Sequence, residues 1–396
     1  MATLVKFPFS PEILDAMPEE LAELYRSLEI TLLKNISDRL VSAGDLNEVT
    51  VQQIRALRSH GISLKDIEKA IQNVTGLSQQ KLDELFADVV RRNQGYYNSL
   101  ITISDVTAPQ ILVGREEIDA LIRQTRGELM NITRSMGFVV GNQLIPPAQA
   151  YQWALDNSAM QIESGAVSYG QAIANATRQL ADSGLQYVDY ESGWRNRVDV
   201  AVRRATLTGI SQLNRKYDEQ AMEILETDLV EVSAHAGARD QGVGFENHES
   251  WQGKVYRWQR YTDLMGQVST GQYPDFEDTC GYGDVQGILG ANCRHSFHAF
   301  VEGVMERTYT DDQLRALNKP PFKYEGRTYT TYEATQKQRQ IETAVRHWKR
   351  REAAATNADD RAAAKARIRA LNAKYREFSN AAGLRMQRER MRVYVG

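Results

Sequence analysis

The sequence has little cysteine and no long apolar run. Only two of its 396 residues are cysteines, Cys280 and Cys293, which is too few for a disulfide framework. The longest uncharged stretch, residues 135–155, carries several amides and two adjacent prolines, so it does not predict a membrane span. The first ten residues lack the basic segment and apolar run of a secretory leader. We therefore expect a protein made and kept in a reducing cytoplasm, or in a particle assembled there.

Common enzyme signatures are also missing. The sequence contains no GxxxxGK(S/T) phosphate loop, no GxGxxG after a strand and no GxSxG elbow. His248 and Glu249 begin like the HExxH metalloprotease motif, but Gln252 stands where its second histidine would be. These absences predict that the protein is not an enzyme.

The composition is that of a folded protein with an uneven charge distribution. Hydrophobic residues make up 42% and charged residues 25%, which together with the length predicts two or three globular domains. Residues 331–396 hold 16 Lys and Arg against 7 Asp and Glu. Such a basic segment contacts nucleic acid or an acidic protein surface, or is a solvated helical face. Its candidate contact residues are Lys349, Arg350, Arg351, Arg388 and Arg390.

Residues 1–185 are predicted to form a helical N-terminal domain. Apolar residues recur there at spacings of three and four, and Pro11 and Pro18 stand where first helical residues are expected. Further helix starts are expected at Ser63 and Ser78. Three later helical patterns span residues 116–136, 147–163 and 169–182.

A small Gly-rich α+β module is predicted at residues 186–305, beginning with a basic helix over residues 194–225. Eleven of the 27 glycines lie between Gly237 and Gly303. Short β-type runs occupy residues 229–233, 255–259 and 296–301, with Gly, Asn and Asp clusters between them.

The remaining sequence predicts two further parts. Residues 306–330 form a connector with a small β-hairpin that turns at Glu325 and Gly326. Residues 331–396 form a basic helical hairpin and tail, with the break between its helices near residues 356–360. The expected fold class is therefore mostly α and multidomain, with one small Gly-rich α+β module.

The module concentrates the residues that bind zinc in proteins. Four of the six histidines and both cysteines lie between residues 235 and 298. On a strand, Cys293 and His295 would share a face, whereas His298 would point to the other. The alternatives are a buried thiol pair, a redox-labile disulfide, and histidines hydrogen-bonded to loop backbone. The candidate zinc ligands are His235, His248, Cys280, Cys293 and His295.

Three other residues of the module are candidates for contact with a partner. Trp258 shares a strand side with Tyr256 and is either an exposed contact or a core aromatic. Arg239 and Arg294 flank the candidate ligands. They either hold a phosphate or a carboxylate, or form structural pairs.

Four sequence blocks carry a resemblance to a known family. The blocks are His-Ala-Gly-Ala-Arg at 235–239, His-Glu-Ser-Trp-Gln-Gly-Lys at 248–254, Cys-Gly-Tyr-Gly at 280–283 and Gly-Ala-Asn-Cys-Arg-His-Ser-Phe at 290–297. In this order they resemble the phage minor capsid protein 2 family, relatives of the Mu-type head-morphogenesis proteins. The resemblance extends to about residue 378 and is looser over residues 1–185.

The resemblance implies a minor structural protein in the virion of a tailed phage, assembled in the host cytoplasm. Its implied partners are the portal protein and other capsid or scaffolding proteins, and its implied role extends to DNA packaging or delivery. Two alternatives stay open. One is a zinc-dependent nuclease or injected effector that uses the His/Cys cluster. The other is a DNA-binding head protein that uses the basic segment at 331–396.

Overall fold

The computed structural model describes residues 7–43, 65–104, 113–164, 167–188, 193–290 and 293–393. The chain divides into two compact units, and each is assembled from three stretches of sequence. Unit 1 comprises Met1–Pro18, Leu82–Thr125 and Thr206–Lys337, and unit 2 comprises Glu19–Lys81, Arg126–Ala205 and Gln338–Gly396. The predicted division into consecutive domains at residues 185, 305 and 330 stays a prediction.

The described residues are mostly helical with small antiparallel sheets, which confirms the predicted fold class. Within the described ranges, four helices contribute residues to both units. They are α4 (Lys65–Ile103), α5 (Arg115–Arg134), α8 (Val198–Ile224) and α13 (Thr331–Ala353).

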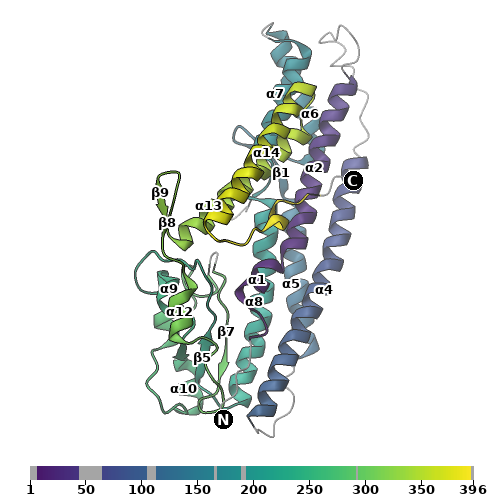
Figure 1. The fold of residues 1–396 in the computed structure, drawn as a ribbon. Coiled ribbons are helices and arrows are strands. Elements are labelled where there is room, and N and C mark those ends of the chain that lie inside the picture. Colours follow the sequence, from purple (N-terminus) through teal and green to yellow (C-terminus); the bar gives the residue numbers. More distant parts are fainter. Residues whose placement is uncertain are drawn as a thin grey trace. The chain divides into compact units, whose positions relative to one another are not determined.

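Unit 2 is built on helices that pack against a four-stranded sheet. Helices α2, α6 and α7 contact one another, and α6 and α7 also contact strand β1 (Figure 1). The strand order is β2-β1-β3-β4, with every pair antiparallel. The elements found only in unit 2 are α2 (Glu19–Ala43), β1 (Met136–Val140), β2 (Gln143–Ile145), α6 (Pro147–Glu163), α7 (Tyr169–Ser183), β3 (Leu185–Val188), β4 (Arg195–Arg197), α14 (Ala358–Ala381) and the 3₁₀ turn η2 (Arg388–Met391).

Helices α6 and α7 confirm two of the predicted helices almost to the residue. Ser168 caps α7 by accepting a hydrogen bond from the Gln171 backbone N–H, and Gly184 ends the helix with a positive φ of 58°. The sheet, by contrast, lies partly in a region predicted to be only helical. Its strands are three to five residues long, which is too short for an alternating pattern to stand out.

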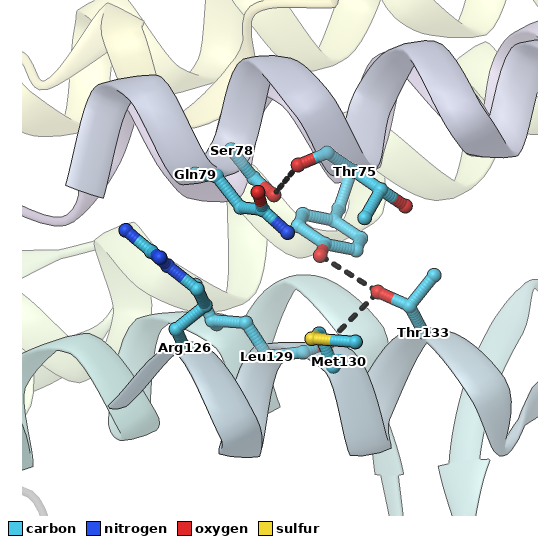
Figure 2. A pocket seen from close by; sticks show the side chains of 8 residues that line it. Thr75, Ser78, Gln79, Arg126, Leu129, Met130 and Thr133 are labelled. Carbon is cyan, nitrogen blue, oxygen red and sulfur yellow. Dashed lines mark hydrogen bonds between the residues drawn. The ribbon is translucent and has the colours of Figure 1, made fainter. Parts of the chain in front are cut away.

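The expected helix start at Ser78 is wrong, because α4 runs through this position without a break. Ser78 Oγ does not cap a new helix; it donates to the Thr75 carbonyl one turn earlier, at 2.9 Å. Figure 2 shows both residues beside a small pocket of unit 2, where Thr133 of α5 lies opposite and hydrogen-bonds the Tyr25 hydroxyl at 2.8 Å. The expected start at Ser63 lies outside the described residues.

Unit 1 contains the three strands predicted for the Gly-rich module. They form an antiparallel sheet in the order β6-β5-β7, in which Val230 pairs with both Tyr256 and Ala299. All residues of β5 and β7 are buried. The elements found only in unit 1 are α1 (Pro11–Ala16), β5 (Leu229–Val232), the 3₁₀ turn η1 (Gly244–Glu246), α9 (His248–Trp251), β6 (Val255–Arg257), α10 (Gln259–Met265), α11 (Phe276–Cys280), β7 (Phe297–Phe300), α12 (Asp311–Leu317), β8 (Phe322–Tyr324) and β9 (Arg327–Tyr329).

The two predicted hairpins are both present. Strands β8 and β9 pair antiparallel, and Glu325 and Gly326 turn the chain with φ values of 46° and 79°. In unit 2, hydrogen bonds from Gln338 to Ser379 and from Tyr375 to Glu342 join α13 and α14. Asn357 caps α14 by accepting from the Asp360 backbone N–H at 2.8 Å, which places the break between the helices where the sequence predicts it.

Trp258 is fully buried, so its interpretation as an exposed contact is wrong. Its ring packs against those of Tyr261, Phe276, Tyr282 and Phe297, with centroids 5.1–5.4 Å away. The indole N–H donates to Glu277 at 2.7 Å. Strand β6 ends before Trp258, so the alternation of strand faces no longer applies to this residue.

Candidate metal centre

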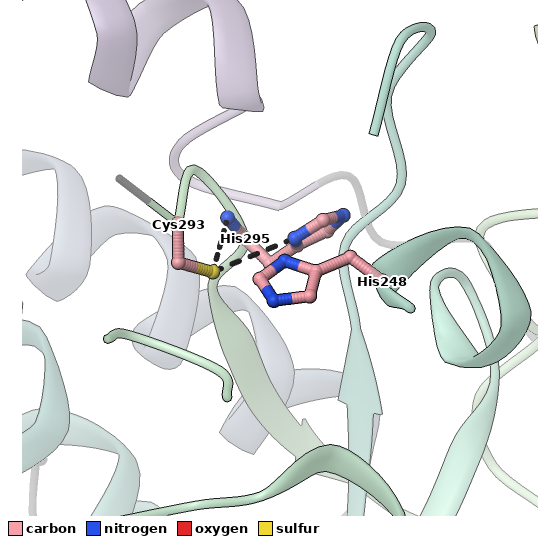
Figure 3. A group of neighbouring side chains, drawn as sticks. All are labelled: His248, Cys293 and His295. Atoms are coloured by element: carbon pink, nitrogen blue, oxygen red, sulfur yellow. Dashed lines mark hydrogen bonds between the residues drawn. The ribbon is translucent and has the colours of Figure 1, made fainter. Parts of the chain in front are cut away.

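Three of the five predicted zinc ligands converge beside the β6-β5-β7 sheet. His248 is the first residue of α9, and Cys293 and His295 lie in the segment that leads into β7. One nitrogen of each histidine and the Cys293 sulfur all lie within 4.8 Å of one another (Figure 3). Both imidazoles are buried, His248 at 3% exposure and His295 at 2%.

Hydrogen bonds at Nε2 orient both imidazole rings. His248 Nε2 lies 2.8 Å from the Gln286 carbonyl oxygen, and His295 Nε2 lies 3.2 Å from Gln252 Oε1. The Gln252 oxygen also accepts from the His235 backbone N–H at 3.0 Å, which fixes which end of the amide faces His295. Because these oxygens only accept, Nε2 carries the hydrogen in each neutral ring, and Nδ1 keeps a free lone pair.

Cys293 lies against the free lone pair of His295. Its sulfur is 3.5 Å from His295 Nδ1 and accepts from the His295 backbone N–H at 3.4 Å (Figure 3). Burial raises the pKa of the Cys293 thiol and lowers that of His248, and it holds the pKa of His295 well below its ordinary value. Without a metal, the three side chains are therefore a neutral thiol and two neutral imidazoles, and the thiol donates to His295.

The other two predicted ligands lie outside this group of three. The His235 ring stacks on that of His295 with centroids 4.5 Å apart and planes at 25°, so the in-plane lone pairs of the two rings do not converge. Burial and the nearby Arg294 lower the pKa of His235 to about 3. Cys280 is a buried free thiol at the end of α11.

Arg239 and Arg294 hold loop carbonyls near the group. Arg239 donates to the Gln286 carbonyl, and Arg294 donates to that of Gly237, each at 3.3 Å. These bonds support the structural alternative for the two arginines. A phosphate or carboxylate ligand at either one stays a prediction.

Gln252 is the site residue that the sequence did not reveal. In the sequence, Gln252 showed only that the HExxH metalloprotease motif is incomplete. In the structure, its amide oxygen orients the His295 ring. No sequence signal pairs these residues, because they are 43 positions apart and meet only in the folded module.

The candidate contact residues of the basic segment are largely engaged within unit 2. Arg350 is 5% exposed and donates to the Ala181 carbonyl at 2.8 Å, so its interpretation as a partner contact is wrong. The neighbouring candidates are bonded too. Lys349 donates to the Met391 carbonyl at 2.6 Å, Arg351 pairs with Asp182, and Arg390 lies 3.7 Å from Glu342, while Arg388 is exposed.

Comparison with known proteins identifies the family. The sequence matches the family described as phage minor capsid protein 2 over residues 9–380. The chain belongs to this family. Its four sequence blocks supply all three residues of the group in Figure 3, together with His235 and Cys280.

Two phage proteins are similar to this member of the phage minor capsid protein 2 family. A protein named "Structural protein" from Lactococcus phage LL-H is 22% identical over 359 residues, which cover 89% of this chain and 90% of that protein. Another "Structural protein", from Lactococcus phage mv4, is 36% identical over 84 residues, or 21% of this chain and 58% of that protein. No solved structure matches the chain significantly. Within the described residues, no helix is long and apolar enough to cross a membrane.

Proposed function

We propose that this chain is a minor structural component of a tailed-phage head. In this proposal it assembles in the host cytoplasm with the portal protein and with other capsid or scaffolding proteins, stays in the virion and aids DNA packaging or delivery. The family match over residues 9–380 carries the proposal. The relative from phage LL-H, which is similar over nearly its whole length, supports it by its description as a structural protein.

The surroundings of the His/Cys group support a structural role over a catalytic one. A zinc hydrolase presents its metal to a substrate through an open coordination position. Here both imidazoles are almost fully buried, and Trp251 covers them with ring centroids 4.6 Å from His248 and 4.8 Å from His295. A phosphodiester would have to displace this packing before it reached the ligand atoms.

Particle composition tests the structural proposal. Quantitative mass spectrometry would compare purified particles with the cytosol of infected cells, using the portal protein as the internal reference. We expect a few copies per portal ring in the particle, and cross-links to the portal in assembling heads. Abundance in the cytosol with absence from particles would contradict the proposal.

A nuclease assay tests the enzyme alternative. DNA and RNA would be incubated with the purified chain, with and without a chelator, and with the variants His248→Ala and Cys293→Ala. We expect the same background cleavage in every sample. Chelator-sensitive cleavage that both variants lose would instead establish a metal-dependent nuclease.

We also propose the basic segment, residues 331–396, as the part of the chain nearest to DNA. Arg388 is its exposed candidate. Binding measured against salt concentration should weaken steeply, and Arg388→Ala should reduce the slope by about 1 if the side chain contacts one phosphate. Binding that does not depend on salt, or an unchanged slope in the variant, would count against this contact.

A further inference from the structure

We propose that His248, Cys293 and His295 bind one zinc ion that cross-links helix α9 to the segment before β7. The ligand atoms are the Nδ1 atoms of the two histidines and the Cys293 sulfur. Within the described residues, no fourth His, Cys or carboxylate joins these three donors. This site does not depend on where the protein assembles, so it can be tested apart from the proposed function.

The separations of the donor atoms fit a tetrahedral zinc site. Zinc binds sulfur at about 2.3 Å and imidazole nitrogen at about 2.0–2.1 Å, so the two donors of a tetrahedron are about 3.5 Å apart. Cys293 Sγ and His295 Nδ1 are separated by 3.5 Å. All donors of the group lie within 4.8 Å of one another, so His248 needs to approach by only about 1 Å to complete the site.

The partners of the ligands are those of a metal site. A histidine that binds a metal through one nitrogen usually donates from the other to a carbonyl or carboxylate oxygen, which fixes its tautomer and direction. His248 and His295 both do this, toward Gln286 and Gln252 respectively. Their Nδ1 atoms are thus already deprotonated, and that of His295 lies 3.5 Å from the Cys293 sulfur. Only the Cys293 thiol has to release a proton, to solvent, when the ion binds.

The donor set selects zinc among the common cations. Magnesium and calcium require oxygen ligands, and within the described ranges no carboxylate joins this group. One thiolate and two imidazoles in a tetrahedral arrangement suit zinc, and cobalt(II) can replace it as a spectroscopic probe.

The ion would stabilise the Gly-rich loop at residues 281–290, which follows α11. The loop packs on itself closely: a Cβ on Gly287 would lie 2.0 Å from the Gly281 carbonyl oxygen, and one on Gly290 would lie 2.4 Å from that of Val285. Gln286 in the same loop holds His248 through its carbonyl. Because Gln286 holds His248, a zinc ion bound by His248 and Cys293 would tie this loop to the segment before β7, and metal loss should loosen the loop.

Metal content of the full-length chain is the direct test. The protein would be purified without chelator, in a non-chelating reductant, loaded with zinc chloride and desalted, and its zinc measured by inductively coupled plasma mass spectrometry. We expect one zinc per chain in the wild type and in Cys280→Ser, the matched control that removes the other thiol of the module. Cys293→Ser and His295→Asn should lose it. A wild type without zinc, or equal zinc in Cys293→Ser, would overturn the proposal.

A variant that fails to fold would also lose zinc, so two further measurements use the wild type. Cobalt(II) should give the intense visible bands of a tetrahedral site together with a thiolate-to-cobalt charge-transfer band, and zinc should abolish both. Zinc should also slow hydrogen exchange of the backbone amides at residues 281–290, and a chelator should reverse this. An octahedral cobalt spectrum without the thiolate band would contradict the proposed site, as would amide hydrogen exchange that zinc does not change.

Discussion

Asp218 and His298 form a buried pair in which His298 Nδ1 lies 3.1 Å from the Asp218 carboxylate. The Tyr97 hydroxyl donates to the same carboxylate oxygen. Phe7 and Tyr96 flank the imidazole ring, with centroids 4.7 Å and 5.4 Å away. Together with Tyr97, the pair joins α4, α8 and β7 within unit 1, and it engages His298 apart from His248 and His295.

Removing Asp218 should therefore destabilise unit 1. Burial raises the pKa of the Asp218 carboxyl, and the bonds from His298 and Tyr97 offset part of this effect. Asp218→Ala would leave both donors without their acceptor in a dry environment, at a cost of about 3–5 kcal/mol. Asp218→Asn keeps an acceptor and should cost clearly less. Urea unfolding followed by tryptophan fluorescence would measure both.

The matched control for this pair is His347 in unit 2. Its Nε2 atom lies 3.6 Å from Asp182, and both side chains are partly exposed. His347→Ala should change the unfolding free energy by about 0–1 kcal/mol. Equal losses in Asp218→Ala and His347→Ala would show that burial does not decide the strength of these pairs.

The buried carboxyl of Glu231 should make stability depend on pH. Burial raises its pKa from 4.5 to about 7, although the Thr308 backbone N–H and hydroxyl donate to it at 2.6 and 3.0 Å. Between pH 4.5 and about 7, Glu231 is therefore protonated in the folded protein and ionised in the unfolded chain. Relative to Glu231→Gln, the wild type should lose about 1.4 kcal/mol of unfolding free energy per pH unit as the pH rises through this window.

Chemical denaturation of both proteins at several pH values would measure this difference, which should become constant above about pH 7. Glu302→Gln is the control, because the Thr270 backbone N–H lowers the pKa of Glu302 instead of raising it. The pH effect of Glu302 therefore lies below 4.5, and its difference curve should be flat at higher pH. A flat curve for Glu231→Gln would contradict the raised pKa.

Two helical glycines should respond in opposite ways to alanine. A Cβ on Gly209 of α8 would lie 2.2 Å from Thr125 Oγ1 and 3.0 Å from the Phe86 ring, whereas one on Gly95 of α4 would meet nothing within 4 Å. Gly209→Ala should cost about 1–3 kcal/mol through overpacking. Gly95→Ala should gain about 0.5–1 kcal/mol from helix propensity. Thermal unfolding would show the two shifts, and a stabilising Gly209→Ala would refute the close packing of these helices.

Removing the buried carboxylate of Glu29 should destabilise unit 2. It accepts hydrogen bonds from the Leu185 backbone N–H and from Arg197, and it lies 3.8 Å from Arg350. Burial lowers the pKa of Arg350 to about 10, and Glu29 is the strongest opposing influence. Glu29→Ala would leave the buried Arg350 guanidinium without this carboxylate. The free energy of unfolding, measured in urea, should fall by about 3–5 kcal/mol.

Asp66 provides the comparison for Glu29 within the same unit. It pairs with Arg39 at 2.7 Å, but 67% of its side chain is exposed. Asp66→Ala should therefore cost no more than about 1 kcal/mol. A loss as large as that of Glu29→Ala would contradict the importance assigned to burial.

Local elements could be predicted wherever their signals lie within a few residues of the sequence. Apolar periodicity predicted α6 and α7, and short β-branched and aromatic runs between turn residues predicted β5, β6 and β7. Four ordered blocks were sufficient to indicate the family, because each records a local arrangement of residue types.

Which distant residues meet could not be predicted locally and depends on the folded chain. Five His and Cys residues satisfied the composition of a zinc site equally well, and chain folding brought together His248, Cys293 and His295 while it stacked His235 on one of them. The strand pattern did not decide whether Trp258 is exposed. In the structure, β6 ends before this residue and its side chain is buried. Contacts of this kind depend on how the chain between the two residues folds. That fold results from packing across the whole unit, and no short stretch of sequence specifies such packing.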